Sequence, residues 1–163
     1  MQITKTKQRV LMFLWLIISI PVIVTLLILM SNQANLSQAP GLLPRLKIFT
    51  TTNRAEVSRE PVLAELQSPQ FKQTADKVFA ALPAIVESLG WEIKEINEDK
   101  LRLRAVVSTP LWKFKDDVVI NVLAGADHSY LLASSQSRIG RADLAANSRH
   151  LQVLLEKLRH AGL

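Results

Sequence analysis

An uncharged stretch near the N-terminus is the feature that most constrains this chain. Residues 10–30 read VLMFLWLIISIPVIVTLLILM, without a single Asp, Glu, Lys or Arg. As an α-helix rising about 1.5 Å per residue, this stretch spans roughly 30 Å, which is the thickness of the hydrocarbon core of a bilayer. Pro21 is tolerable in a membrane helix. The sequence therefore predicts one transmembrane helix over residues 10–30.

The charges that flank this segment predict its orientation. Lys5, Lys7 and Arg9 precede it, and the next cationic residue is Arg45. By the positive-inside rule, residues 1–9 form a cytoplasmic N-terminus and the C-terminal domain lies outside, in the periplasm or thylakoid lumen. A cleaved signal peptide is the alternative. We expect an anchor, because the apolar run is longer than the usual 7 to 15 residues and the following SNQANLSQAP lacks a small-x-small site.

Composition narrows the classes of function. Three of the 20 Lys and Arg residues precede the apolar run, and the other 17 stand against 14 Asp and Glu, which is too mild an excess to indicate nucleic-acid binding. The chain has no Cys, so disulfides, thiol nucleophiles and thiolate metal sites are excluded. We predict no cofactor.

After the apolar segment, Ser, Asn, Gln, Thr, Pro and Ala dominate, and neither a helical nor a strand period persists. We interpret residues 31–67 as a linker that becomes ordered near its end. Residues 68–163 then form the folded domain.

The periodicity of residues 68–163 predicts two helices and four strands. One helix begins after Thr74 and ends at Gly90, and another begins near Asp143 and carries leucines at helical spacing. Between them, two pairs of short apolar runs are joined by turn-like segments, which indicates antiparallel hairpins. The predicted strands are residues 91–96, 101–108, 118–123 and 129–135.

This order of elements predicts an α+β fold. We expect a two-layer sandwich, in which a four-stranded antiparallel sheet is covered on one face by two helices and is preceded by one transmembrane helix. The opposite face of the sheet must be solvated, paired or bound.

Two segments carry a family resemblance. Residues 114–120 read FKDDVVI, and residues 135–144 read SQSRIGRADL. They resemble the bacterial and plastid family catalogued as domain of unknown function 1499 (DUF1499), which shows an aromatic-x-Asp-Asp strand, then Ser-x-Ser-Arg-x-Gly-x-Ser-Asp-Leu, then a helix containing Asn. Here Asn147 takes that helix position, and the resemblance covers roughly residues 53–158.

This chain departs from the family pattern at two places. Relatives often carry Pro-Asn-Cys-Val-Ser-Ser where residues 52–58 here read TNRAEVS, and Ala142 replaces a common Ser. A thiol role in relatives therefore does not transfer. The resemblance implies the domain boundary and an envelope location, and it supplies no substrate.

The candidate site is a corner made of Asp116, Asp117, Arg138, Arg141 and Asn147. Adjacent strand residues point to opposite faces, so a catalytic pair of the two carboxylates is disfavoured. The two arginines precede a helix N-terminus, where an anion or lipid head group can bind. We favour a structural latch instead, in which one of the aspartates pairs with one of the arginines.

A second candidate is the loop with Trp112 and Phe114, which also contains Lys113 and Lys115. It suits a headgroup layer or a protein partner. The alternative is that the two aromatic side chains close the end of the core, and the sequence leaves both interpretations open.

Motifs for known chemistry are missing from the sequence. His128, His150 and His160 have no zinc-ligand spacing, and we expect all three at the surface. The serines lack a Gly-x-Ser-x-Gly elbow, and no phosphate-binding glycine loop occurs.

These observations favour a non-catalytic, membrane-tethered interaction or assembly module whose partner is a membrane or envelope protein. One alternative is a small enzyme for an anionic envelope metabolite or lipid, with Asp117 as base. Another is a lipid or pigment carrier, which requires an enclosed apolar cavity between sheet and helices.

Overall fold

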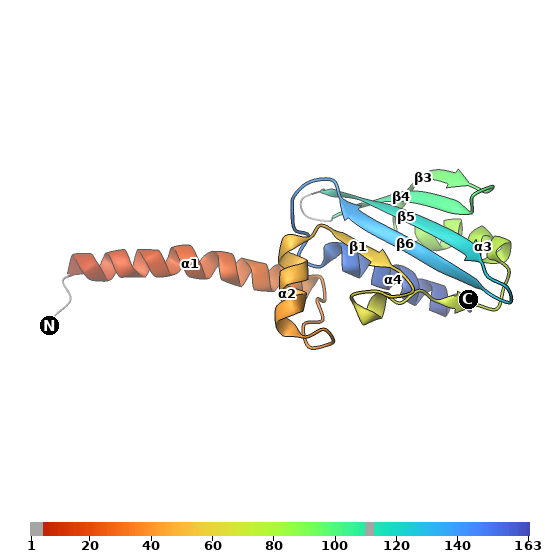
Figure 1. Ribbon diagram of the computed structural model, residues 1–163. Coiled ribbons are helices and arrows are strands. Elements are labelled where there is room, and N and C mark those ends of the chain that lie inside the picture. The colour runs from red at the N-terminus through yellow and green to blue at the C-terminus, as the bar shows by residue number, and fades with distance from the viewer. Residues whose placement is uncertain (1–4, 110–112) are drawn as a thin grey trace.

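The computed structural model describes residues 5–109 and 113–163, and it shows a long N-terminal helix followed by a two-layer α+β domain (Figure 1). The α+β fold is therefore as predicted. The elements in chain order are α1 (Lys5–Ser31), α2 (Leu42–Thr51), β1 (Arg54–Val57), η1 (Ala64–Leu66), β2 (Gln70–Phe71), α3 (Ala75–Ser88), β3 (Glu92–Asn97), β4 (Arg102–Ser108), β5 (Lys115–Ala124), β6 (Ser129–Ser137) and α4 (Ala146–His160).

The sheet has six antiparallel strands where the sequence predicts four. The order is β1-β6-β5-β4-β3, and the short β2 also pairs with β6, so β1 and β2 share one edge of that strand. The four predicted strands are β3 to β6. The added strands have only 4 and 2 residues, and a segment that short shows no persistent alternation in its sequence.

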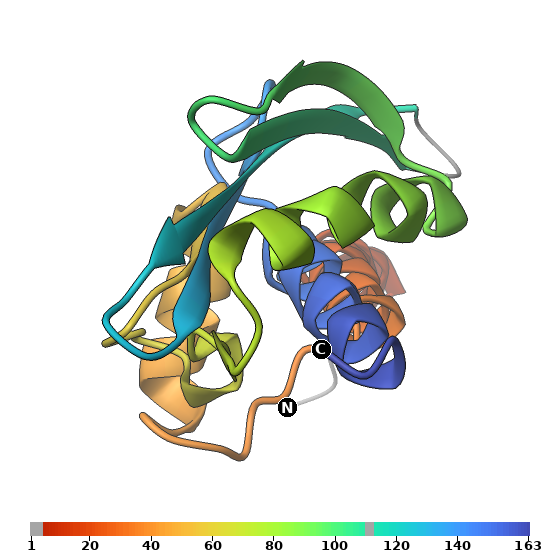
Figure 2. The ribbon, with the colours of Figure 1, turned by 90° about the vertical axis from the view of Figure 1, so that its right-hand side faces the viewer.

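Helices α3 and α4 cover the same face of the sheet, as predicted (Figure 2). Helix α3 contacts β3, β4 and β5, and α4 contacts β1 and β6. Helix α3 ends where Gly90 adopts φ +73, and its N–H donates to the carbonyl of Glu87 at 2.9 Å. Glycine takes this left-handed conformation without the steric cost of a Cβ, so it closes the helix and turns the chain into β3.

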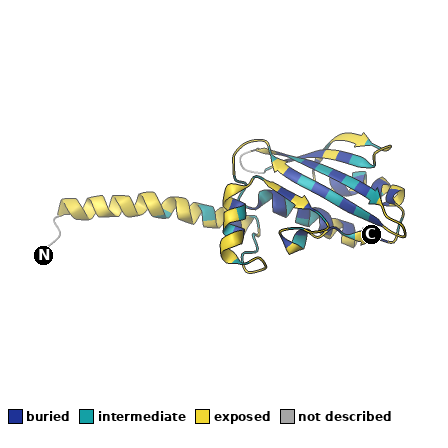
Figure 3. Cartoon of the chain, in the orientation of Figure 1, coloured by how far each residue is buried: buried dark blue, intermediate teal, exposed yellow. Residues whose placement is uncertain are grey.

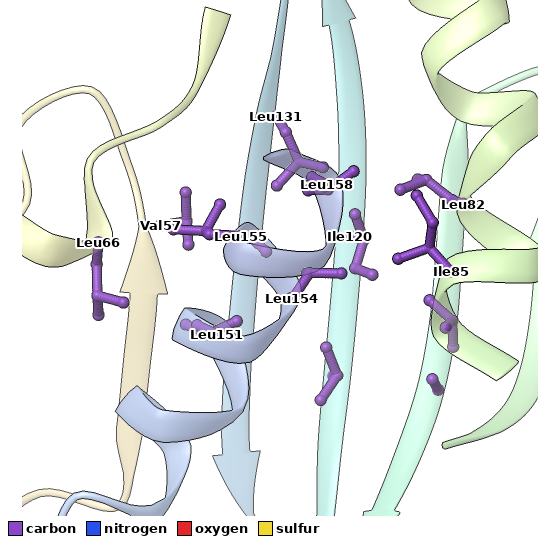
Figure 4. Close-up of a cluster of buried hydrophobic side chains, with 14 of the residues drawn as sticks. Val57, Leu66, Leu82, Ile85, Ile120, Leu131, Leu151, Leu154, Leu155 and Leu158 are labelled. Atoms are coloured by element: carbon purple, nitrogen blue, oxygen red, sulfur yellow. The ribbon is translucent and has the colours of Figure 1, made fainter. Parts of the chain in front are cut away.

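The core fills the space between the two helices and the sheet (Figure 4). Helix α4 contributes four leucines at i, i+3, i+4 and i+7, which therefore share one face. The inward side chains of the central strands, such as Leu103, Ile120 and Leu131, are fully buried beneath them. Each such side chain contributes about 1.5–3 kcal/mol by leaving water. The four leucines are Leu151, Leu154, Leu155 and Leu158.

Helix α1 is long and apolar enough to cross a membrane, and its side chains are exposed along nearly all of its length (Figure 3). Its last turn is different, because Leu29 is only 1% exposed and belongs to the core of the domain. Beyond it, the Asn32 side chain donates to the carbonyl of Leu144 at 2.9 Å. The helix therefore joins the domain directly, without a free spacer.

Residues 31–67 hold more structure than the linker predicted from their composition. They contain α2, β1 and η1, and the buried side chains of Phe49 and Val57 extend the core. The sequence pattern does not indicate these elements, because α2 buries only two of its ten residues and β1 is four residues long. The folded domain therefore begins well before residue 68.

The buried side chain of Arg45 links the parts of residues 31–67 to one another. Its guanidinium is fully buried, pairs with both carboxylate oxygens of Glu65 at 2.7 Å and donates to the carbonyls of Gln38 and Ala39. Burial alone raises the pKa of Glu65, but the hydrogen bonds and charge of Arg45, with a backbone hydrogen bond, outweigh it and lower that pKa below its ordinary value. One side chain thus ties α2, the loop before it and η1.

Replacing Arg45 with Ala is expected to cost about 3–5 kcal/mol in the free energy of unfolding, because it leaves Glu65 charged and poorly solvated. The lowered pKa of Glu65 adds stability that is complete above about pH 4.3 and is lost as the pH falls through the folded-state pKa. Arg45→Ala should remove that acid-dependent part. Denaturant titration in detergent micelles at several pH values measures both effects.

The matched control is Arg54→Ala, which breaks the exposed Arg54–Glu56 pair at 2.6 Å. That change should cost less than about 1 kcal/mol. Equal losses for the two variants would contradict the structural role assigned to Arg45.

Candidate functional site

The adjacent carboxylates of β5 lie on opposite faces of the sheet, as the strand geometry predicts. Asp116 points toward the helices and is 1% exposed, whereas Asp117 lies on the open face. The register places Asp116 opposite Ser137 and Asp117 opposite Gln136 of β6. The two carboxyl groups therefore cannot share one substrate.

Asp117 pairs with Arg138 in a two-pronged contact. The guanidinium Nε and Nη2 atoms donate to the carboxylate at 2.9 and 2.7 Å. The hydrogen bond from Arg138, more than its charge, holds the pKa of Asp117 below its usual range. This is the ion pair that the latch interpretation requires, and it joins β5 to the segment after β6.

Asn147 lies at the centre of the corner and is fully buried. Its Oδ1 accepts from the Ser135 hydroxyl at 2.5 Å, and the hydrogens of its Nδ2 are shared among the Asn53 carbonyl, the Ser137 Oγ and the Asp143 carboxylate at 2.5–2.9 Å. One amide thus connects the segment before β1, strand β6 and the first turn of α4.

Asp143 completes the entry into α4. Its carboxylate accepts from the backbone N–H groups of Ala145 and Asn147, although α4 begins three residues later than the sequence predicts, at Ala146. Burial raises the pKa of Asp143, an effect that these hydrogen bonds partly oppose and the charge of Asp116 reinforces. Gly140, Leu144 and Ala145 have positive φ, so the chain turns sharply here.

His150 packs against this corner with only 15% of its side chain exposed, so the expectation of surface placement is wrong for it. Its Nδ1 lies 3.5 Å from the Asp116 carboxylate and 3.5 Å from Ser135 Oγ, and its ring meets Trp91 edge-on. Burial lowers the pKa of His150, against the opposing charge of Asp116. A lone histidine without ligand spacing gives no signal of burial, and the signal that could have placed His150 near the core face is the leucine periodicity of α4, because residue 150 lies four positions before Leu154.

Ser135, His150 and Asp116 do not form a hydrolytic triad. Both the serine and the carboxylate approach the same ring nitrogen, whereas a triad uses the two nitrogens for the two partners. Ser135 is 0% exposed, and its hydroxyl hydrogen is already donated to Asn147. The arrangement satisfies buried polar groups instead of presenting a nucleophile.

The other predicted site residues lie on the surface or outside the described chain. Phe114 is 50% exposed, so it does not close the core, and Trp112 lies outside the described residues. Arg141 is exposed and takes no part in the Asp117–Arg138 pair. The structure therefore unites four of the five corner residues around β6 and leaves Arg141 at the surface.

Two surface pockets lie outside this corner, and the second borders it through Thr52, Arg54 and Ser148. One of about 460 Å³ is bordered by polar groups that include Arg59 and His128, and Arg59 stacks over the Tyr130 ring at 4.0 Å. The other, of about 360 Å³, lies between α2, β1 and the segment before η1. Within residues 5–109 and 113–163, no group of three or more side chains is arranged to hold a metal ion.

Comparison with known proteins identifies the family to which the chain belongs. Residues 44–158 match the family described as "Protein of unknown function (DUF1499)", which confirms the resemblance carried by residues 114–120 and 135–144, and the chain belongs to this family. No curated protein matches the chain. A crystal structure of a conserved protein from Geobacillus kaustophilus is similar to part of it, with 17% identity, a TM-score of 0.30 and coverage of 58% of this chain and 91% of that one.

Replacing Asn147 with Ala is expected to lower the free energy of unfolding by about 2–4 kcal/mol, because it leaves Ser135 and the Asn53 carbonyl buried without this partner. Urea titration in detergent, followed by circular dichroism, measures the loss. Asn121→Ala, on the open face of β5, should change stability by less than about 0.5 kcal/mol. A tolerated Asn147→Ala would show that the corner does not depend on this amide.

Proposed function

We propose that this protein is a membrane-anchored, non-catalytic interaction module that uses the open face of its sheet to hold an envelope protein. In this proposal α1 crosses the membrane with its N-terminus in the cytoplasm, and the DUF1499 domain lies outside. The observation that carries it is the placement of α3 and α4 on one face, which leaves the other face of the sheet without a covering helix among the described residues (Figure 2).

The open face has the composition of a protein-binding surface. Along β5, apolar side chains alternate with a carboxylate and an amide, and β6 places two apolar side chains before a hydroxyl and an amide. Such a mixture binds through a small apolar centre with a polar rim. The side chains are Asp117, Val119, Asn121 and Leu123 of β5, and Tyr130, Leu132, Ser134 and Gln136 of β6.

The chemistry of the corner supports a non-catalytic role. Asp117, the candidate base, is engaged by Arg138 on both oxygens, which holds the carboxylate ionised and stabilises it against accepting a proton. The Ser135 hydroxyl donates its hydrogen bond to the Asn147 side chain inside the core. The space between sheet and helices, where a carrier needs a cavity, is filled by core side chains (Figure 4).

The orientation is tested with reporters fused after Leu163. Alkaline phosphatase, which folds only outside the cytoplasm, should be active in this fusion, and a cytosolic fluorescent reporter should not be. The matched variant replaces Lys5, Lys7 and Arg9 with Gln, which should reduce the bias by removing the leading cations. Phosphatase inactivity with cytosolic fluorescence in the unmodified fusion would contradict the proposed side.

The binding face is tested by photo-crosslinking in native membranes. A photoreactive phenylalanine analogue at Asn121 or Ser134, both on the open face, should give one discrete higher-mass product. The same group at Lys77 of α3 or Glu156 of α4, both exposed on the helical layer, should not. Products from the helical layer alone, or from none of the four positions, would overturn the choice of face.

A further inference from the structure

The end of the domain next to α1 is held close to the end of the apolar segment. Leu29, which is one residue before the end of the uncharged run, is already buried by the domain. Ala34 donates its N–H to the Leu29 carbonyl, and Asn32 reaches Leu144. If α1 spans a bilayer, this end of the domain has to lie at the headgroup layer, because no flexible linker separates α1 from the domain.

Three segments form this anchor-side end (Figure 1). Helix α2 runs across the end of α1, and the segment from Arg138 to Ala145 lies beside it through hydrogen bonds from Asp143 and Leu144 to α2 and the residue after it. Residues 113–115, which lead into β5, join them, because Arg138 donates its N–H to the Lys115 carbonyl at 3.1 Å. All three face the side from which α1 leaves.

Large apolar side chains are exposed on all three segments. Leu42 and Leu43 of α2 are 53% and 76% exposed, Ile139 is 72% exposed and Phe114 is 50% exposed. In water each of these side chains is an unfavourable surface, whereas a headgroup and acyl-chain boundary accommodates it. Outside α1, the only other exposed large apolar side chains among the described residues are Val62, at 73%, and Ile96, at 45%.

Cations accompany these side chains. Lys47 of α2, Lys113, Lys115 and Arg141 are exposed, and no ion pair to any of them occurs among residues 5–109 and 113–163. The acidic groups nearby are engaged, since Asp117 pairs with Arg138 and Asp143 is tied to Asn147. Glu92, which the charge of Lys115 also reaches, pairs with Lys94. An apolar surface with unpaired cations matches an anionic lipid layer.

We propose that the anchor-side end of the domain is a lipid-binding surface, with the four apolar side chains inserted at the boundary of the acyl chains and the four cations contacting anionic head groups. These four cations come from α2, from residues 113–115 and from the segment after β6. The surface is distinct from the open sheet face. Its binding to lipid does not depend on which side of the membrane the domain lies.

Because the chain has no Cys, single labels can be placed on the full-length protein. Leu43→Cys, Phe114→Cys and Ile139→Cys, each carrying an environment-sensitive dye, are compared in nanodiscs with Ile96→Cys, an exposed apolar position on β3. Brominated lipid should quench the first three labels several-fold more strongly than the fourth, and aqueous iodide should show the reverse. Quenching of all four by iodide alone overturns the proposal.

The charge contribution is tested in the same nanodiscs. Replacing phosphatidylcholine in part with phosphatidylglycerol should increase lipid quenching at Leu43, and the triple variant Lys113→Gln, Lys115→Gln, Arg141→Gln, which retains Lys47, should remove most of that increase. The control triple variant Lys77→Gln, Lys100→Gln, Lys157→Gln should keep it. Labels shielded from both quenchers would indicate a protein contact and would also overturn the proposal.

Discussion

The side chain of Asn147 is the interaction on which the arrangement of this domain depends. It has one acceptor and two donor hydrogens, and the structure directs them to β6, to the residue before β1 and to the start of α4. Backbone turns alone cannot specify how a helix enters beneath the edge of a sheet. A fully buried amide can specify this arrangement, because each polar group that loses its hydrogen-bond partner away from water costs free energy.

The ion pair and the amide act at the same corner from opposite sides of the sheet. Asp117 and Arg138 fix β5 to the segment after β6 on the open face, while Asn147 and Asp143 fix that segment on the helical face. Gly140 lies between them in a left-handed conformation, and the Asn53 side chain donates to its carbonyl at 2.7 Å. The segment that carries the family resemblance is therefore explained by the hydrogen bonds and turns of one corner.

The sequence predicts those parts of the structure whose residues repeat. Alternation locates β3 to β6, and leucines at helical spacing locate α4 and the face that it buries. The opposite orientation of Asp116 and Asp117 follows from strand geometry alone. What escapes prediction depends on contacts between distant residues: Arg45 reads as a linker cation and is fully buried with Glu65, and His150 reads as a surface residue and lies beside Asp116. No local pattern encodes such partners, because each is 20 or more positions away in the chain.

The junction between α1 and the domain determines how the open face is turned relative to α1. Leu29 and Asn32 fix the end of α1 to the domain through buried and hydrogen-bonded contacts, and Arg45 holds the loop that follows, so the orientation of the domain follows that of the helix. The strands of the sheet run away from the anchor-side end, roughly along the direction of α1 (Figure 1). In a membrane the open face would therefore be turned sideways, parallel to the bilayer normal. For the proposed interaction, this orientation suits a partner anchored in the same membrane, because two such proteins stand side by side with their surfaces parallel to the bilayer normal.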